Sequence, residues 1–343
     1  MLPYSLLIAG VILTALTIYA LTGGADFGGG VWDLLALGPR AKAQRELIAN
    51  AIAPIWEANH VWLIVVIVLL FVCFPVAFAA VMTALHIPLV ILLVGVVLRG
   101  SAFTFRAYGI QSQQAHAAWG RVFAIASVFT PIFLGVTLGG VASDKIRVDL
   151  ATGIPDVDFF SAWLAPFPFA LGLLVLSLFA FLAAVYLAVE AETPELKEDF
   201  RRRGLVSGVL VGVFAWVCFY FAGTGAPELW KGLGSEWWSL PFQVVTGGVA
   251  VAAMAALWWG RFALARILAG LQVTLMIWGW GFAQYPYIVP PDLTLTNSAG
   301  PDSVLGPVLI ALVAGLILVI PAFAFLYSLF KGRGKAPAHG ASS

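Results

Sequence analysis

Apolar runs of about twenty residues recur along the whole chain, and they constrain its fold more than any other feature. A run of this length crosses the hydrocarbon core of a bilayer as a single helix. Composition agrees, because 62% of the 343 residues are hydrophobic and only 10% are charged. A soluble domain of this size needs far more charge to cover its surface. The sequence therefore predicts an all-α integral membrane protein.

The apolar runs predict nine transmembrane helices, at residues 4–36, 44–73, 76–98, 118–140, 164–189, 205–223, 241–259, 263–285 and 304–330. The first run lacks a basic segment before it and a small-residue cleavage site after it. We therefore expect it to remain as a span rather than to be removed as a signal peptide. The spans form one transmembrane domain over residues 1–330, and residues 331–343 form a polar cytoplasmic tail.

The distribution of Lys and Arg predicts the orientation of these helices. Alternate loops hold 15 basic residues in one set and 3 in the other. The positive-inside rule then places the N-terminus outside and the C-terminus in the cytoplasm. The larger set comprises Arg40, Lys42, Arg45, Arg99, Arg106, Arg121, Lys197, Arg201, Arg202, Arg203, Arg261, Arg266, Lys331, Arg333 and Lys335, and the smaller comprises Lys145, Arg147 and Lys231. The net charge of +1 gives no overall field that would attract nucleic acid.

Two acidic residues lie far from the ends of the first two predicted spans. The loop between these spans centres near residues 41–42, and Asp26 precedes it by about as much as Glu57 follows it. Antiparallel neighbours would hold both side chains at a similar depth, roughly 20 Å from the loop. Ionisable groups at this depth cost several kcal/mol unless they are paired or hydrated, and they are functional by default. We predict a carboxylate pair that passes protons.

Asp33 and Asn50 mirror each other in the same way, nearer the cytoplasm. Each lies seven residues from an acid of the deeper pair, and a spacing of seven returns to about the same helix face. If these faces meet, two polar levels lead from the cytoplasm to Asp26 and Glu57. The alternative is that the acids only hold helices together by hydrogen bonds.

Histidines and arginines in spans 2 and 3 leave further interpretations open. If the chain turns near residues 74–75, His60 and His86 lie at similar depth. Two imidazoles on antiparallel helices could ligate a b-type haem within this chain. We interpret Arg99 and Arg106 as interfacial residues whose charged ends reach toward water. A proton-coupled transporter that uses Asp26 and Glu57 as its coupling pair is a second alternative.

Several segments resemble subunit II of cytochrome bd-type quinol oxidases. They are "TGGADFGGGVWDLL", "IAPIWEANHVWLI", "FPVAFAAVMTALHIPLVILLVGVVLRGSAFTFR" and "YPYIVP", and the match is densest over about residues 20–108. "PIWEANHVWL" with "LRGSAFTFR" is far more specific than a short catalytic motif. One departure is visible: many relatives carry an acid where this chain has Thr104.

The resemblance implies nine transmembrane helices arranged as two four-helix bundles and one peripheral helix. It implies a pseudo-symmetric partner, subunit I, that holds haems b and d, or haem b only, and oxidises quinol. The complex would reduce oxygen to water in a bacterial or archaeal cytoplasmic membrane, and this chain would not be catalytic alone. Some relatives bind a structural quinone, and small single-span subunits are further expected partners.

The same resemblance suggests roles for individual residues of this chain. Glu57 would be the proton relay, Asp26 its partner and His60 a hydrogen-bond orienter or secondary acceptor, with Trp56 packed beside the channel. Proton uptake would begin near Asp33 and Asn50. The residues agree with a partner role: four histidines cannot ligate three haems, and the sequence has no metal cluster, nucleotide loop or nucleophilic triad.

Overall fold

The computed structural model describes residues 3–52, 56–108, 113–156 and 158–332. The side chains of Trp56, Glu57, Arg106 and His116 are among those outside this description. The described chain is helical except for two short antiparallel strand pairs, β1 with β2 and β3 with β4. The strands are β1 Arg147–Val148, β2 Pro155–Asp156, β3 Tyr287–Val289 and β4 Leu293–Thr294.

Twelve helices make up the rest of the described chain. They are α1 Tyr4–Leu34, α2 Ala41–Ile52, α3 Trp56–Cys73, α4 Pro75–Ala84, α5 His86–Tyr108, α6 Gln113–Val141, α7 Pro166–Glu190, α8 Pro194–Gly225, α9 Pro227–Ser235, α10 Ser239–Trp258, α11 Phe262–Gln284 and α12 Asp302–Gly332. Eight helices in the described ranges are long and apolar enough to cross a membrane, or up to nine spans if α3 and α4, bent by 118°, count as one. The prediction of an all-α, multi-span membrane protein is confirmed.

The structure corrects the third predicted span and leaves part of the second outside its description. Within residues 44–73 it describes α2 and α3, which lie on either side of the undescribed residues 53–55. The span predicted at 76–98 was wrong. Pro75 cannot donate a backbone hydrogen bond, so α3 ends and the short α4 begins there at a sharp angle. The crossing helix α5 starts only at His86 and continues to Tyr108.

Helix α7 forms the centre of the bundle. In its most apolar stretch 72% of the residues are buried, more than in any other candidate span in the described ranges. Phe179, Leu182 and Val185 of α7 belong to the largest cluster of buried apolar side chains, which also draws residues from α1, α6, α8, α10 and α11. The polar surface of a soluble protein is replaced on the outer helices by exposed apolar side chains, as contact with lipid tails requires.

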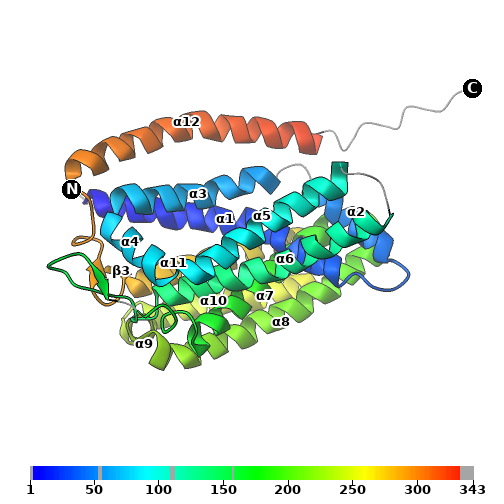
Figure 1. Ribbon diagram of the computed structural model, residues 1–343. Coiled ribbons are helices and arrows are strands. Elements are labelled where there is room, and N and C mark those ends of the chain that lie inside the picture. The colour runs from blue at the N-terminus through cyan, green and yellow to red at the C-terminus, as the bar shows by residue number, and fades with distance from the viewer. Residues whose placement is uncertain (1–2, 53–55, 109–112, 157, 333–343) are drawn as a thin grey trace, which may run out of the picture.

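The connections gather at two opposite ends of the bundle (Figure 1). One end holds α2 and the α7–α8 and α10–α11 turns, and it carries most of the described residues of the larger basic set; we call it the basic end. The other end holds α4, α9 and both strand pairs. Helices α1 and α12 start at this second end, and α12 runs along the edge of the bundle with 6% of its most apolar stretch buried.

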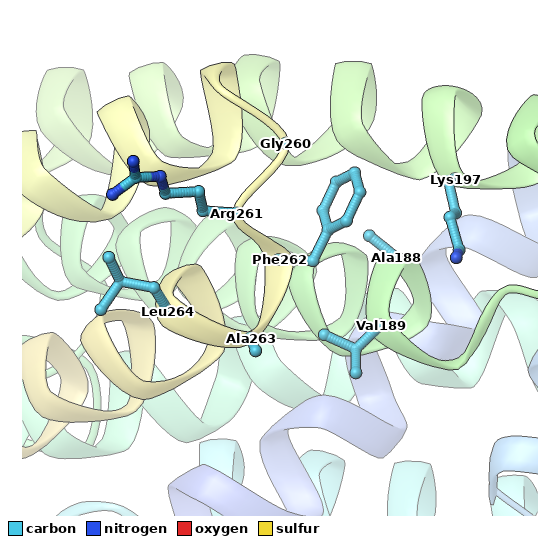
Figure 2. A pocket seen from close by; sticks show the side chains of 8 residues that line it. All are labelled: Ala188, Val189, Lys197, Gly260, Arg261, Phe262, Ala263 and Leu264. Carbon is cyan, nitrogen blue, oxygen red and sulfur yellow. The ribbon is translucent and has the colours of Figure 1, made fainter.

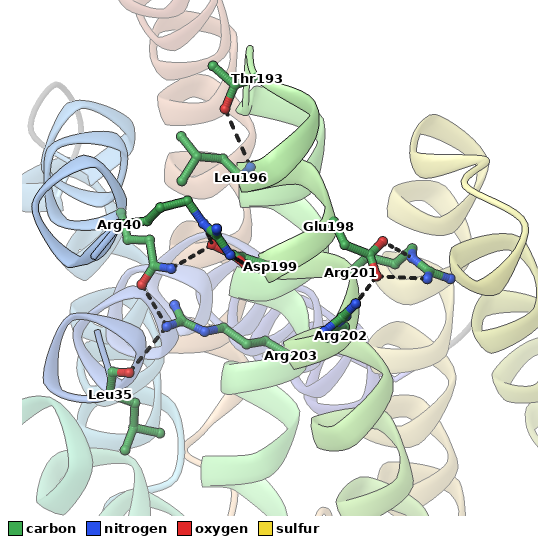
Figure 3. A network of polar contacts seen from close by, with 10 residues as sticks. Leu35, Arg40, Thr193, Leu196, Glu198, Asp199, Arg201, Arg202 and Arg203 are labelled. Carbon is green, nitrogen blue, oxygen red and sulfur yellow. Dashed lines mark hydrogen bonds and ion pairs between the residues drawn. The ribbon is translucent and has the colours of Figure 1, made fainter. Parts of the chain in front are cut away.

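A polar network fixes the basic end (Figure 3). Asp199 of α8 accepts hydrogen bonds from Arg40 Nε and Nη2 at 2.8 and 2.6 Å and from Gln44 Nε2 at 2.7 Å. Arg203 Nη2 donates to Gln44 Oε1 at 2.8 Å and to the carbonyl of Leu35 at 3.2 Å. These bonds hold the α1–α2 connection and α2 against the start of α8, which sets where α1 leaves the membrane core.

A shallow cavity of about 500 Å³ lies at the same end, beside the α10–α11 turn. Figure 2 shows its lining from the end of α7, the start of α8 and the first turn of α11. Lys197 and Arg261 are its charged residues, and none of the predicted proton-relay residues lines it. The candidate site is therefore a buried side-chain cluster rather than this cavity.

Candidate functional site

Helix α1 has two different faces where it passes α7. Gly28 lies so close to α7 that a Cβ atom there would stand 1.9 Å from the carbonyl oxygen of Phe179. The backbones can meet only because Gly28 has no side chain. Asp26 is two residues away, about 200° around the helix, and so points away from this contact. The glycine run thus presses α1 against α7 while its acid faces α3.

Asp26 is buried, with 6% of its surface exposed, and it is bonded to α3. Asn59 Nδ2 donates a hydrogen bond to Asp26 Oδ2, and Asn59 is also buried. From the sequence we expected Asp26 to lie at the depth of Glu57. In the described structure the partner of Asp26 is Asn59, two positions after Glu57. The side chains of Glu57 and Trp56 lie outside the described part, so their expected positions stay predictions.

The guanidinium of Arg99 lies beside this pair, where the sequence led us to expect an interfacial residue. Arg99 of α5 is only 2% exposed. Its Cζ lies 4.6 Å from the ring centroid of Phe27 and 5.2 Å from that of Phe123, so the cation stacks between aromatic faces of α1 and α6. Its charge also acts on Asp26. A buried carboxylate therefore has an opposite charge near it, as a low-dielectric surrounding requires.

His60 and Tyr19 complete the cluster on the side away from the basic end. Their ring centroids are 5.8 Å apart, and His60 also packs edge-on to Phe27 at 6.0 Å. Tyr19 is fully buried, and neither its Oη nor Nδ1 of His60 has a hydrogen-bond partner among the described residues. Helices α1, α3 and α5 thus enclose one continuous polar cluster inside the membrane-spanning region.

Nearer the basic end, the expected pair of Asp33 and Asn50 is not formed in the described residues. Asp33 is buried, and Arg45 Nε lies 3.9 Å from its Oδ1. Asn50 is exposed on α2. The physical reason is that Asn50 faces outward from α2, whereas Asp33 faces the interior from α1.

The structure does not bring His60 and His86 together. His60 lies near the start of α3, whereas His86 is the first residue of α5, beyond the bent α4. His86 is exposed, its ring stands edge-on to Phe159 at 5.1 Å, and its Nδ1 donates to the carbonyl of Thr83 at 2.9 Å. The expected equal depth of the two imidazoles was wrong, because the chain does not turn back directly at residues 74–75. The described residues therefore do not fit a haem held between these histidines.

Two members of the cluster, Asn59 and Arg99, were missed as functional candidates. Asn59 lies within the segment "WEANH". A carboxamide at that depth in a predicted span was itself a sign of a functional residue. Arg99 was assigned to a helix end because the third span was expected to finish at residue 98. The nine residues after it, "GSAFTFRAY", contain no proline and continue α5. The lack of a proline there was the sign that the helix continues past Arg99, which places Arg99 within the span rather than at its end.

The sequence matches the family described as cytochrome bd terminal oxidase subunit II over residues 4–330. The chain belongs to this family. The cytochrome bd-I ubiquinol oxidase subunit 2 of Escherichia coli (strain K12) is 26% identical over 218 residues, which are 63% of this chain and 55% of that protein. Cytochrome bd ubiquinol oxidase subunit 2 of Bacillus subtilis (strain 168) is 34% identical over 113 residues, 33% of this chain and 32% of that one.

The fold agrees with that of a solved bd oxidase. The structure resembles a chain of the bd oxidase from Geobacillus thermodenitrificans with a TM-score of 0.81, covering 97% of this chain and all of that one at 21% identity. Membership of the cytochrome bd subunit II family makes this chain a multi-span component of a terminal oxidase, an oxidoreductase of the respiratory membrane. In the described residues, no group of three or more His, Cys, Asp or Glu is placed to hold a metal ion.

Proposed function

We propose that this chain is the subunit II that pairs with a haem-bearing subunit I and delivers cytoplasmic protons to the oxygen-reducing site of that partner. The observation that carries the proposal is the buried bond between Asp26 and Asn59 beside the charge of Arg99. A carboxylate, a carboxamide and a guanidinium together are costly to bury and do little for packing. Their presence in an oxidase subunit favours a role in proton transfer.

The path in this proposal starts at the basic end. Protons are taken up near Asp33, with Asn50 on the exposed face of α2, and pass to Asp26 and Glu57. Asn59 orients the Asp26 carboxylate by donating to one of its oxygens, which leaves the other oxygen to accept a proton. His60 is the secondary acceptor and Trp56 packs beside the path. The proposal assigns haem chemistry to the partner, and the separation of His60 from His86 in the described residues is consistent with that assignment.

The finer architecture belongs to the same proposal. Nine crossings, as two four-helix bundles and one peripheral helix, place the N-terminus outside and the C-terminus in the cytoplasm. The isolated position of α12 in Figure 1 supports its assignment as the peripheral helix. A single transmembrane domain then covers residues 1–330, followed by a cytoplasmic tail, and the assembled complex lies in the bacterial inner membrane.

The test is a pair of charge-removing substitutions in the intact oxidase. We expect Asp26→Asn and Glu57→Gln each to lower quinol oxidase turnover roughly tenfold or more, because each removes a group that must gain and lose a proton. Haem spectra should be unchanged. The controls Asp158→Asn and Glu46→Gln alter exposed acids outside the cluster and should leave turnover as it was. Normal turnover and normal proton uptake in both relay variants would overturn the proposal.

A further inference from the structure

Four buried polar atoms from three helices have no hydrogen-bond partner among the described residues. They are Tyr19 Oη, His60 Nδ1 and, in Arg99, Nε and Nη2. The rings of Tyr19 and His60 are 5.8 Å apart, and the charge of Arg99 acts on both. Phe27 contacts both Arg99 and His60. The four atoms therefore belong to one small region enclosed by α1, α3 and α5.

Burying polar groups without partners is costly, and nearly all such groups in folded proteins are satisfied by protein or by ordered water. The other two polar side chains of the described cluster, Asp26 and Asn59, already bond to each other. The chemistry of the three side chains suits water. A guanidinium only donates, whereas a phenol and a neutral imidazole can each donate and accept. Water that accepts from Arg99 can donate onward to His60 and Tyr19, and a buried water commonly makes about three hydrogen bonds.

We propose that Tyr19, His60 and Arg99 hold a group of ordered water molecules that extends the proton path beyond Asp26. This inference rests on the proposed function. Tyr19 lies seven residues before Asp26 on α1, about 10 Å further from the basic end. The bound water carries the proton, while Tyr19 and Arg99 keep theirs and act as positioning residues. Arg99 thereby has two tasks: it balances the charge of Asp26 and it anchors the first water.

The direct test is a structure of the intact oxidase at a resolution that shows water. We expect ordered water within hydrogen-bond distance of at least two of the four atoms. Direct bonds between the three side chains, or a lipid tail in the region, would overturn the inference. This measurement does not depend on activity, so it also decides the matter if a variant fails to assemble.

The functional test is Tyr19→Phe, which removes the hydroxyl and keeps the ring. We expect turnover to fall several-fold and the solvent deuterium isotope effect on turnover to increase, with unchanged haem spectra. A merely structural hydroxyl would not change the isotope effect. The matched control is Tyr220→Phe on α8, because Tyr220 is 67% exposed. Its turnover and isotope effect should equal those of the parent.

The two proposals fail in different ways. If Asp26→Asn is slow but Tyr19→Phe behaves like Tyr220→Phe, the water path beyond Asp26 is wrong and the proposed function stands. If Asp26→Asn and Glu57→Gln both retain full turnover and normal proton uptake, the proposed function fails, and the path that extends from Asp26 fails with it.

Discussion

At the scale of single residues, the central question is how a membrane protein keeps ionisable groups in its interior. Asp26 and Arg99 are both buried, and each is stabilised by more than the other's charge. Asn59 donates to the carboxylate, and Phe27 and Phe123 offer ring faces to the cation. Loss of one charged partner leaves the other uncompensated in a low-dielectric surrounding, which typically costs about 3–5 kcal/mol.

This cost predicts a non-additive pair of substitutions. Arg99→Met should destabilise the oxidase strongly, because it leaves the Asp26 carboxylate buried without a counter-charge. Adding Asp26→Asn should restore part of that loss, with a coupling of about 1–3 kcal/mol for residues in one network. The apparent melting temperature of the purified complex, measured for both single variants and the double variant, checks this. Additive losses would show that the two side chains do not interact.

At the scale of helices, the lengths of the apolar runs predicted most helix boundaries. The prediction failed where charged residues or a proline interrupted a run. Helices α1, α6, α7, α10, α11 and α12 begin and end within a few residues of the predicted spans. The larger differences lie between residues 41 and 108 and at the charged start of α8, which begins at Pro194 rather than at residue 205. Hydropathy alone could not show that Pro75 starts a bent segment rather than a return helix, and that single error displaced the third span by ten residues. Arg99 was misplaced for the same reason.

The site was partly predictable at this scale. Equal sequence distance from a loop put Asp26 opposite the start of α3, where Asn59 lies. Distance alone could not show which residue of that helical turn faces α1, because neighbouring residues point in different directions around a helix. Asn59 is the described partner of Asp26, and the contact expected for Glu57 stays a prediction. The glycines mark the face of α1 that packs against α7, and the acid lies on the opposite face. Only the structure shows why glycine is needed, because it reveals the contact with Phe179.

The close contact of α1 with α7 predicts that Gly28→Ala damages the site from a distance. The added Cβ would stand 1.9 Å from a backbone carbonyl, so α1 must shift, and overpacking of this kind commonly costs about 1–3 kcal/mol. We expect a lower apparent melting temperature and lower turnover. The control is Gly10→Ala on the same helix, where nothing lies within 4 Å of the new Cβ. Equal behaviour of the two variants would contradict the packing of α1 described here.

At the scale of the whole molecule, function depends on which end faces the cytoplasm. The proposed proton path would open at the basic end, where Asp33 lies beside Arg45 and where the network of Asp199 ties α2 to α8. The proposed function takes protons for water formation from the cytoplasm, and it therefore requires the basic end to face the cytoplasm. Without the buried Arg99, the excess of 14 basic residues over 3 supports that orientation.

Labelling of single cysteines at the two ends tests this orientation. Glu46 is exposed on α2 at the basic end, and Asp158 is exposed after β2 at the opposite end. The native Cys73 and Cys218 are buried, which keeps background labelling low. In intact spheroplasts a membrane-impermeant maleimide should label Asp158→Cys and should label Glu46→Cys only after permeabilisation. The reverse pattern would place Asp33 and the basic end outside, and a path from the cytoplasm to Asp26 would then have to start at the strand-bearing end of the bundle.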